Sequence, residues 1–440
     1  MSTKSKIMEE YNKNNIVKRT SVRWYIFIAV LVLATINYVD RAVLSVAMPQ
    51  IQKDLHLNAA ITGVILSSFF WGYAAMQIPA GFLLDKYRTE KVVLGSAIGW
   101  GLAQTLTGFA SSSGVLMALR ALLGVTESPV MTAGAKLQGK WLPSKERARG
   151  ATIVDGGAPL GSAIGGPIIV AFMAWFGGWR GALIGAGLMT IIVGIICYFV
   201  IKGDPDTNKR VNAAERQYIQ SALKEEYEAA QKEAKIEIGA KQYLQSRNFW
   251  GMCLGWFSFN TVFYGLLTWG PTFLAKTQHI NISSIGFSTL IIFGFGFIGE
   301  LTGGILADKW REKGGKYNTV MRTIFAIAGI GTSIAIFLLA KTASLTMAIS
   351  LLTIALFFLR WAGIFWSVPA AIAQRQHVGV IGGCMNLAGN IAGVITPIYI
   401  GLIVQFTGSF YAGLMIFTIA GLLLALSGAI INYEKKIGVV

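Results

Sequence analysis

Long apolar stretches separated by short polar segments fill almost the whole chain. Twelve such stretches lie at residues 24–46, 59–84, 92–111, 114–138, 148–175, 181–201, 248–275, 284–308, 321–341, 345–374, 380–406 and 410–432. A helix needs about 20 apolar residues to cross a hydrocarbon core of about 30 Å, and each stretch is long enough to do so. The pattern therefore predicts an all-α membrane protein with twelve transmembrane helices.

The longest polar segment divides these helices into two groups of six. Residues 202–247 carry nine Lys or Arg and eight Asp or Glu residues. Within them, "AAERQYIQSALKEEYEAAQKEAK" predicts a solvated helix with mixed charges. We therefore expect an N-terminal bundle over 24–201, a linker over 202–247 and a C-terminal bundle over 248–432, with terminal segments at 1–23 and 433–440.

The two halves repeat each other. The segment "GFLLDKYR" at 81–88 recurs as "GILADKWR" at 304–311, each at the end of the second helix of its half. The segment "LRALLGVTESP" at 119–129 recurs as "LRWAGIFWSVP" at 359–369. Internal repeats of this kind are typical of transporters, whose binding sites lie between the repeats. The sequence thus predicts two pseudo-symmetric six-helix bundles.

Composition and charge agree with a membrane protein and predict its orientation. The chain is 54% hydrophobic and 13% charged, which argues against a soluble protein. If both termini lie in the cytoplasm, only four of the 38 Lys and Arg residues fall outside, and three fall inside helices. The positive-inside rule then predicts cytoplasmic termini in the inner membrane. The basic residues are scattered over many short loops, which disfavours a nucleic-acid partner.

Cysteine and histidine usage offers no catalytic or metal centre. Cys197, Cys253 and Cys384 fall within predicted helices, and the three histidines lie far apart in the sequence. These positions form no disulfide framework, zinc spacing or haem motif. We therefore predict no cofactor and no metal, and a protein that is not an enzyme.

Seven ionisable residues lie inside predicted helices, where each costs about 2.5–3.5 kcal/mol at a helix centre. They are Asp40, Arg41, Arg120, Glu127, Asp155, Glu300 and Arg360. This cost indicates that they face one another or a central cavity rather than lipid. Neighbours on a helix point about 100° apart, so Asp40 and Arg41 need different partners. Arg120 and Glu127 are seven residues apart and share a helix face.

These residue types suit the movement of an anion together with a proton. Burial favours the protonated form of a carboxylate, and a nearby arginine favours the charged form, so a carboxylate between these influences can carry a proton. An arginine keeps its charge and can hold a carboxylate with two donors. The alternative for Asp40 and Glu127 is a fixed ion-pair network that only locks the helices together.

The six-plus-six arrangement and the repeated G-x-L-x-D-[KR]-x-R element resemble the major facilitator superfamily. In that family the element is a latch between the two halves, although Thr89 and Glu90 replace the usual Gly-Arg ending here. The resemblance implies alternating access. The residues that it and the repeat suggest for gating are Gly81, Asp85, Lys86, Arg88, Glu300 and Asp308.

Four motifs in order resemble the anion:cation symporter branch, which includes galactonate and glucarate carriers, sialin and vesicular glutamate transporters. They are "NYVDRAVLSVA", "R-x3-G-x2-E-S-P" at 120–129, "KWLPSKERARG" at 140–150 and "GGCMNLAGNIAGVITP" at 382–397. The resemblance implies proton symport of a sugar acid or a related hydroxy mono- or dicarboxylate, with Asp40 and Glu127 as proton-coupling residues. The candidate substrate-binding residues are Arg41, Arg120, Tyr38, Tyr73, Trp366, Ser367 and Asn386.

Arg360 departs from the resemblance, because the sugar-acid carriers generally have an uncharged residue there. Its symmetry with Arg120 suggests that it also faces the cavity and binds substrate. Either the substrate carries a second acidic group, or Asp155 neutralises the extra arginine. Tyr73 is as consistent with core packing as with binding. An organic-anion exchanger, a drug exporter and a transporter-derived sensor are the alternatives to an importer, and we expect a monomer.

Overall fold

The computed structural model describes residues 19–232, 239–277, 280–342, 344–374 and 377–438, and within these ranges it contains helices and no strands. The N-terminal half comprises α2 (Val22–Asp54), α3 (Ala59–Lys86), α4 (Thr89–Thr107), α5 (Ser113–Trp141), α6 (Ser144–Asp155), α7 (Gly157–Phe176) and α8 (Trp179–Ile201). The linker contains α9 (Ala213–Lys232) and α10 (Ala240–Leu244). The C-terminal half comprises α11 (Arg247–Thr277), α12 (Ile282–Glu312), α13 (Tyr317–Leu339), α14 (Leu345–Arg360), the 3-10 helix η1 (Trp361–Ser367), α15 (Val368–Ile372), α16 (Val378–Thr407) and α17 (Tyr411–Ile430).

These helices account for the twelve predicted spans. By length and apolar content, ten spans among the described residues can cross a membrane. In this set α6 and α7 together make one span, as do α14, η1 and α15. The helices α4 and α11 cover the two remaining predicted stretches. The prediction of an all-α membrane protein in two six-helix halves is confirmed.

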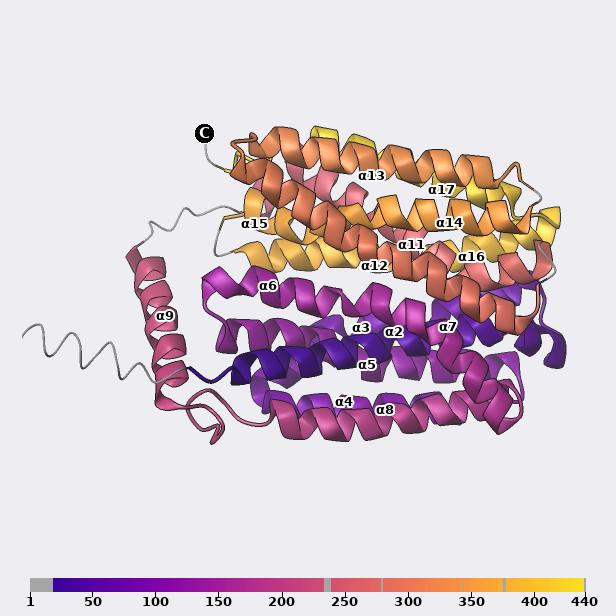
Figure 1. Cartoon of the computed structure of the whole chain (residues 1–440), viewed down its shortest axis with the longest axis horizontal. Helices are drawn as coiled ribbons and strands as arrows, with labels where there is room; N and C mark the ends of the chain where they lie inside the picture. The colour runs from indigo at the N-terminus through magenta and orange to yellow at the C-terminus, as the bar shows by residue number, and fades with distance from the viewer. Residues whose placement is uncertain (1–18, 233–238, 278–279, 343, 375–376, 439–440) are drawn as a thin grey trace, which may run out of the picture.

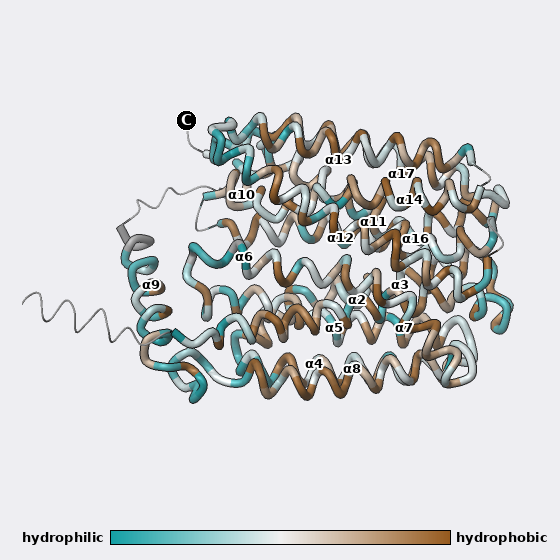
Figure 2. The backbone as a smooth tube through the Cα atoms, viewed as in Figure 1, coloured by the Kyte–Doolittle hydropathy of each residue, from teal (hydrophilic) through white to brown (hydrophobic). Residues whose placement is uncertain are grey.

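The two halves lie side by side as separate bundles (Figure 1). We call the end at which α9 lies and α2 begins the linker end, and the opposite end the far end. The bundles touch mainly through α3 with α16, α7 with α12 and α2 with α11, and α2 also makes a smaller contact with α12. The outer helices α4, α8 and α13 are strongly hydrophobic along their length, and hydrophilic residues concentrate at the ends and on α9 (Figure 2). This distribution suits a bundle surrounded by lipid, because lipid-facing surfaces must be apolar.

Contact between α3 and α16 begins at the far end and stops before the linker end. Along this contact, which we call the first seam, Gln405 accepts from the backbone N–H of Ala59 at 3.1 Å, and the Ser67 hydroxyl donates to the carbonyl of Val394 at 2.7 Å. The last polar contact is the Asn386 amide donating to Gln77 Oε1 at 3.4 Å. Ten of the fourteen residues of α3 before Tyr73 are buried, whereas after it only Ala80 and Leu84 are. The bundles are thus joined at the far end and separate toward the linker end.

Proline interrupts the helices at two positions where the sequence predicts continuous spans. Pro159 has no N–H to donate to the carbonyl of Asp155, four residues earlier, and the helix breaks there at Gly156, between α6 and α7. In the other half, α14 tightens into the 3-10 helix η1 before Pro369. As a result, Asp155 and Arg360 each stand at the end of an α-helix, at the level where the two bundles meet.

The linker helix α9 is anchored to the N-terminal half at its first turn. The Glu215 carboxylate is fully buried, and it accepts from Arg23 Nη1 at 2.7 Å and from Thr20 Oγ1 at 2.6 Å. Arg23 also pairs with Glu146, the start of α6, at 2.8 Å. The sequence predicts a solvated helix with mixed charges here, and its first turn differs because Glu215 is buried. The pattern of hydrophilic residues along the helix does not predict which acidic residue pairs with a buried arginine.

Gly124 lets α5 approach α3 closely, and we expect its replacement to disturb the interior. A Cβ atom at Gly124 would lie 2.7 Å from the backbone nitrogen of Tyr73. Gly124→Val is therefore expected to force α5 away from α3 and to lower stability by about 1–3 kcal/mol, the usual cost of overpacking. Thermal unfolding in detergent measures the loss. Gly139→Ala, on the same helix with no atom within 4 Å, is the matched control, and equal effects of both would contradict the packing argument.

Candidate functional site

Arg41 of α2 and Glu127 of α5 form a buried ion pair. Arg41 donates to Glu127 Oε1 from Nη2 at 2.8 Å and from Nε at 3.2 Å. Both side chains are almost completely buried. Because breaking a buried ion pair leaves an uncompensated charge, each residue constrains the other strongly.

Asp40 points in another direction, as expected for the neighbour of Arg41 on a helix. Its Oδ2 accepts from Trp100 Nε1 of α4 at 2.7 Å and from Thr190 Oγ1 of α8 at 2.8 Å. Its Oδ1 has no hydrogen-bond partner among the described residues. Asp40 is therefore a buried carboxylate that the N-terminal bundle holds by neutral donors and not by a direct ion pair.

Arg120 of α5 lies between these two carboxylates without a close ion pair in the described part of the chain. It is 3% exposed, and its Nε and Nη1 have no hydrogen-bond partner there. Glu127 and Asp40 are both within its electrostatic reach. A buried guanidinium with open donors is a suitable site for an anion, because an anion would satisfy both its charge and its hydrogen-bonding capacity.

Aromatic rings surround the arginines of the N-terminal half. The Arg41 guanidinium lies 4.5 Å from the ring centre of Tyr38, 4.6 Å from Phe69 and 5.1 Å from Tyr73. Arg120 lies 5.3 Å from the same Phe69 ring. Such contacts stabilise a cation that has lost its water. The structure thus gives Tyr73 a contact with a candidate binding residue as well as a packing role.

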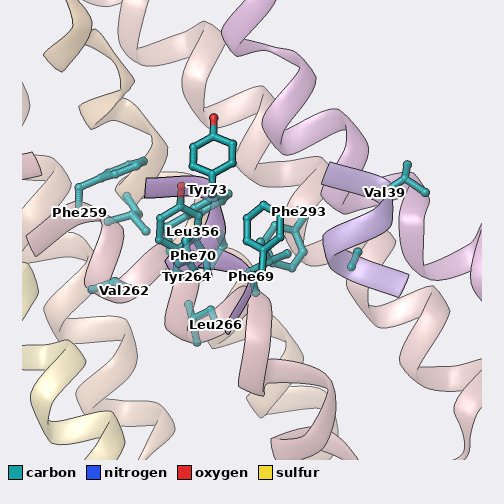
Figure 3. Packing of buried hydrophobic residues seen from close by; sticks show 14 of the residues in the cluster. Val39, Phe69, Phe70, Tyr73, Phe259, Val262, Tyr264, Leu266, Phe293 and Leu356 are labelled. Carbon is teal, nitrogen blue, oxygen red and sulfur yellow. The ribbon is translucent and has the colours of Figure 1, made fainter. Parts of the chain in front are cut away.

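The same aromatic cluster joins the two bundles. Phe70 lies 4.6 Å from Tyr264, and Tyr38 lies 6.2 Å from Phe263, measured between ring centres. Figure 3 shows rings of the N-terminal half beside those of α11 and α12. The cluster occupies the middle of the bundle interface, so the Arg41 region and the C-terminal half are connected by packed rings.

Arg360, at the end of α14, contacts two carboxylates. Its Nη2 pairs with Asp155 Oδ2 at 3.4 Å and forms a short contact with Glu300 Oε2. Trp366 donates from Nε1 to Asp155 Oδ1 at 3.2 Å. Asp155 belongs to the N-terminal half and the other three residues to the C-terminal half, so this cluster crosses the bundle interface. Of the two readings left open by the sequence, the pairing of Asp155 with Arg360 is present.

Three other predicted binding residues, Trp366, Ser367 and Asn386, lie in η1 and α16. Trp366 is 41% exposed in η1, whereas the hydroxyl of its neighbour Ser367 donates to its own helix backbone at Ile364. Asn386 contacts Gln77 at the end of the first seam. The structure therefore brings Trp366 to the Arg360 cluster, and it places Asn386 on the other seam.

The charged gating residues predicted in the first repeat find their partners within the N-terminal half. Asp85 pairs with Lys136 Nζ of α5 at 3.0 Å, and Arg88 pairs with Glu90 at 2.6 Å. Lys136 also donates to the carbonyl of Leu84. The Lys136 contacts join the linker ends of α3 and α5, whereas Arg88 and Glu90 pair locally at the start of α4. Gly81 has open space around it, Lys86 lies beside Tyr87, and Asp308 is exposed at the linker end of α12.

Several contacts of the site have no signal in the sequence. Trp100 and Thr190 lie in apolar helices that carry no other mark of function, and Phe69 is one ring among many. The sequence suggests a gating role for Glu300, whereas the structure places it beside Arg360, a predicted binding residue. The signal that could have found it is the pair of repeat mates Gln77 and Glu300, because both stand four residues before the repeated glycine.

The profile of the Major Facilitator Superfamily matches residues 30–397. The chain belongs to this superfamily. The probable galactarate/D-glucarate transporter GudP of Bacillus subtilis (strain 168) is 30% identical over 96% of this chain and 93% of its own length. The probable sulfoacetate transporter SauU of Cupriavidus necator is 30% identical over 91% of both chains. The hexuronate transporter of Bacillus subtilis is 28% identical over 91% of this chain and 92% of its own length.

Solved structures agree on the fold of this superfamily member. An inward-facing, occupied bacterial homologue of the human lysosomal transporter Spinster matches with a TM-score of 0.72, at 18% identity, over 93% of this chain and 96% of that chain. This facilitator is accordingly a multi-pass membrane transporter, and not an enzyme. Both predictions are confirmed.

Proposed function

We propose that the protein imports a small hydroxylated organic anion, a sugar acid or a related mono- or dicarboxylate, together with protons by alternating access. The observation that carries the proposal is the buried group formed by Asp40, Arg41, Arg120 and Glu127, because Arg120 has open donors beside two carboxylates. The named substrates of its relatives, galactarate, D-glucarate and hexuronate, belong to this chemical class. Organic-anion exchange and drug export lack a comparable observation.

In this mechanism Arg120 binds the substrate carboxylate, and Asp40 and Glu127 take up protons. Protonation of Glu127 weakens its hold on Arg41 and leaves that guanidinium available to the anion. A substrate without the proton would add a negative charge beside two buried carboxylates, which is costly. Anion and proton therefore favour each other's binding, which is the requirement for symport.

The orientation follows from charge. We assign the linker end to the cytoplasm, with both termini there, because loops at that end carry most of the basic residues. The bundles are joined at the far end and separate toward the linker end, so the described conformation corresponds to access from the cytoplasm. One chain contains both bundles and all the proposed site residues, which supports a working monomer in the inner membrane.

Reconstitution tests the proposal directly. Proteoliposomes with an imposed pH gradient, acidic outside, are expected to accumulate labelled D-glucarate, and a protonophore is expected to abolish the accumulation. Exchange without response to the gradient would indicate an anion exchanger. Binding without transport would indicate a sensor, and movement against the proton flow an exporter.

Arg360 distinguishes diacid from monoacid substrates. If it binds a second carboxylate, Arg360→Asn is expected to weaken uptake of D-glucarate by tenfold or more while leaving D-gluconate nearly unchanged, because only the diacid loses a partner. Competition uptake measures both. Equal loss of both acids, with recovery in the double variant Arg360→Asn plus Asp155→Asn, would instead show that Arg360 and Asp155 form a structural ion pair.

A further inference from the structure

The two seams between the bundles end in chemically different ways. The first seam, α3 with α16, ends in the neutral amides Gln77 and Asn386. The second seam, α7 with α12, packs closely at Gly166 and Gly286 and ends at Asp155 and Glu300. Gln77 and Glu300 are equivalent positions of the repeat. The symmetry therefore gives an internal reference, in which one seam carries acids where the other carries amides.

At the end of the second seam, two carboxylates share one guanidinium. Asp155 and Glu300 both contact Nη2 of Arg360, and Glu300 also lies within hydrogen-bonding reach of Asp155. Two ionised carboxylates cannot hydrogen-bond with each other, and close pairs in proteins hold one proton between them. Without that proton the three groups carry a net charge of about −1 in a site where Arg360 is 3% exposed.

The surroundings supply little to offset this charge. Trp366 donates to Asp155, and Tyr38 of α2 is a further titratable group within electrostatic reach of Arg360 and Asp155. The facing helix α11 contributes the rings of Phe259 and Phe263, 5.5 and 5.2 Å from the guanidinium. Meanwhile Arg360 Nε is buried with no hydrogen-bond partner among the described residues. Arg360 thus contacts both carboxylates through Nη2, and its Nε donor has no partner among the described residues.

We propose that Asp155 and Glu300 share a proton and form a second proton-binding site, built across the two bundles, that controls whether Arg360 can accept an acidic group of the substrate. Without the proton, the two carboxylates hold Arg360 and their excess charge repels an anion. With it, the three groups are neutral and the open edge of Arg360 can bind the anion. This inference rests on the proposed organic-anion transport and deepens it, because it adds a site outside Asp40 and Glu127.

The shared proton is tested without any substrate. Infrared spectra of the purified protein, titrated with pH, are expected to contain a protonated carboxyl band that is lost in both Asp155→Asn and Glu300→Gln. Each variant leaves Arg360 with one carboxylate, a neutral pair, so folding is expected to survive. Gln77→Ala, at the equivalent position of the first seam, is the control and keeps the band. Retention of the whole band in both acid variants overturns the shared proton.

The link to the anion is tested by equilibrium binding of D-glucarate at several pH values. If anion binding requires a bound proton, the affinity for the anion falls about tenfold per pH unit above the pH range in which that proton dissociates. The affinity of the wild type for D-glucarate is expected to fall about tenfold more per pH unit than that of Asp155→Asn. Gln77→Ala is expected to follow the wild type. Equal slopes in the wild type and Asp155→Asn overturn the link. A wild type that binds no D-glucarate refutes the proposed substrate, while the infrared result still decides the proton site.

Discussion

Asp40→Asn and Glu127→Gln are each expected to abolish accumulation of D-glucarate driven by a pH gradient. An amide has nearly the shape of the acid but cannot carry a proton, so the variant loses the coupling step while the arginines remain. For Asp40→Asn, the donors Trp100 and Thr190 can still reach the remaining oxygen. The ratio of the D-glucarate concentration inside the proteoliposomes to that outside should therefore fall to one, its equilibrium value. Exchange of substrate in the absence of a pH gradient should be partly retained.

The control for this experiment is a carboxylate away from the interior. Asp206 lies in the linker and is exposed, so Asp206→Asn is expected to accumulate substrate as the wild type does. Undiminished uphill uptake by both Asp40→Asn and Glu127→Gln would remove them as proton carriers. The fixed ion-pair network would then be the better description of this cluster.

Arg41→Ala is expected to abolish transport and to destabilise the protein. Two of its donors hold Glu127, and removal leaves that carboxylate buried without its cation. Breaking a buried pair by removing one partner costs about 3–5 kcal/mol. The rings of Tyr38 and Phe69 also lose the cation that lies over them. Thermal unfolding and D-glucarate binding measure the two effects separately.

Two further variants separate the charge of Arg41 from its shape. Arg41→Lys keeps the positive charge but cannot donate to Glu127 from two nitrogens of a planar group, so stability is expected to recover more than transport. The double variant Arg41→Ala plus Glu127→Gln removes the uncompensated charge and should recover most of the lost stability without transport. Near-normal substrate affinity in Arg41→Ala would exclude this residue from the binding site.

The fold was predictable because its signals are local or repeated. Each transmembrane span can be recognised from its own run of about 20 apolar residues, independently of the helices that pack against it. The repeated "GFLLDKYR" and "GILADKWR" reveal the two-fold relation between the halves without any contact information. The helix interruptions at Gly156 and before Pro369 were less visible, because the hydropathy of those stretches stays high across the break.

The membership of the site was partly predictable, because charge inside a membrane is costly and rare enough to stand out. That cost identifies Asp40, Arg41, Glu127 and Arg360 as interior residues. It does not predict which of them form ion pairs or hydrogen bonds with each other. Arg120 and Glu127 share a face of α5, yet the direct partner of Glu127 is Arg41 on α2. Partner choice depends on how each helix is rotated against its neighbours.

By itself, the sequence determined that this chain is a membrane protein of two related six-helix halves with a charged interior, because hydropathy, repeats and charge are properties of residues in order. The tertiary structure alone decided that Asp40 is held by Trp100 and Thr190, and that Asp155 and Glu300 meet at Arg360. These contacts join helices up to 205 positions apart. They arise from close packing between helices and bundles, in which the shape of every neighbouring side chain takes part.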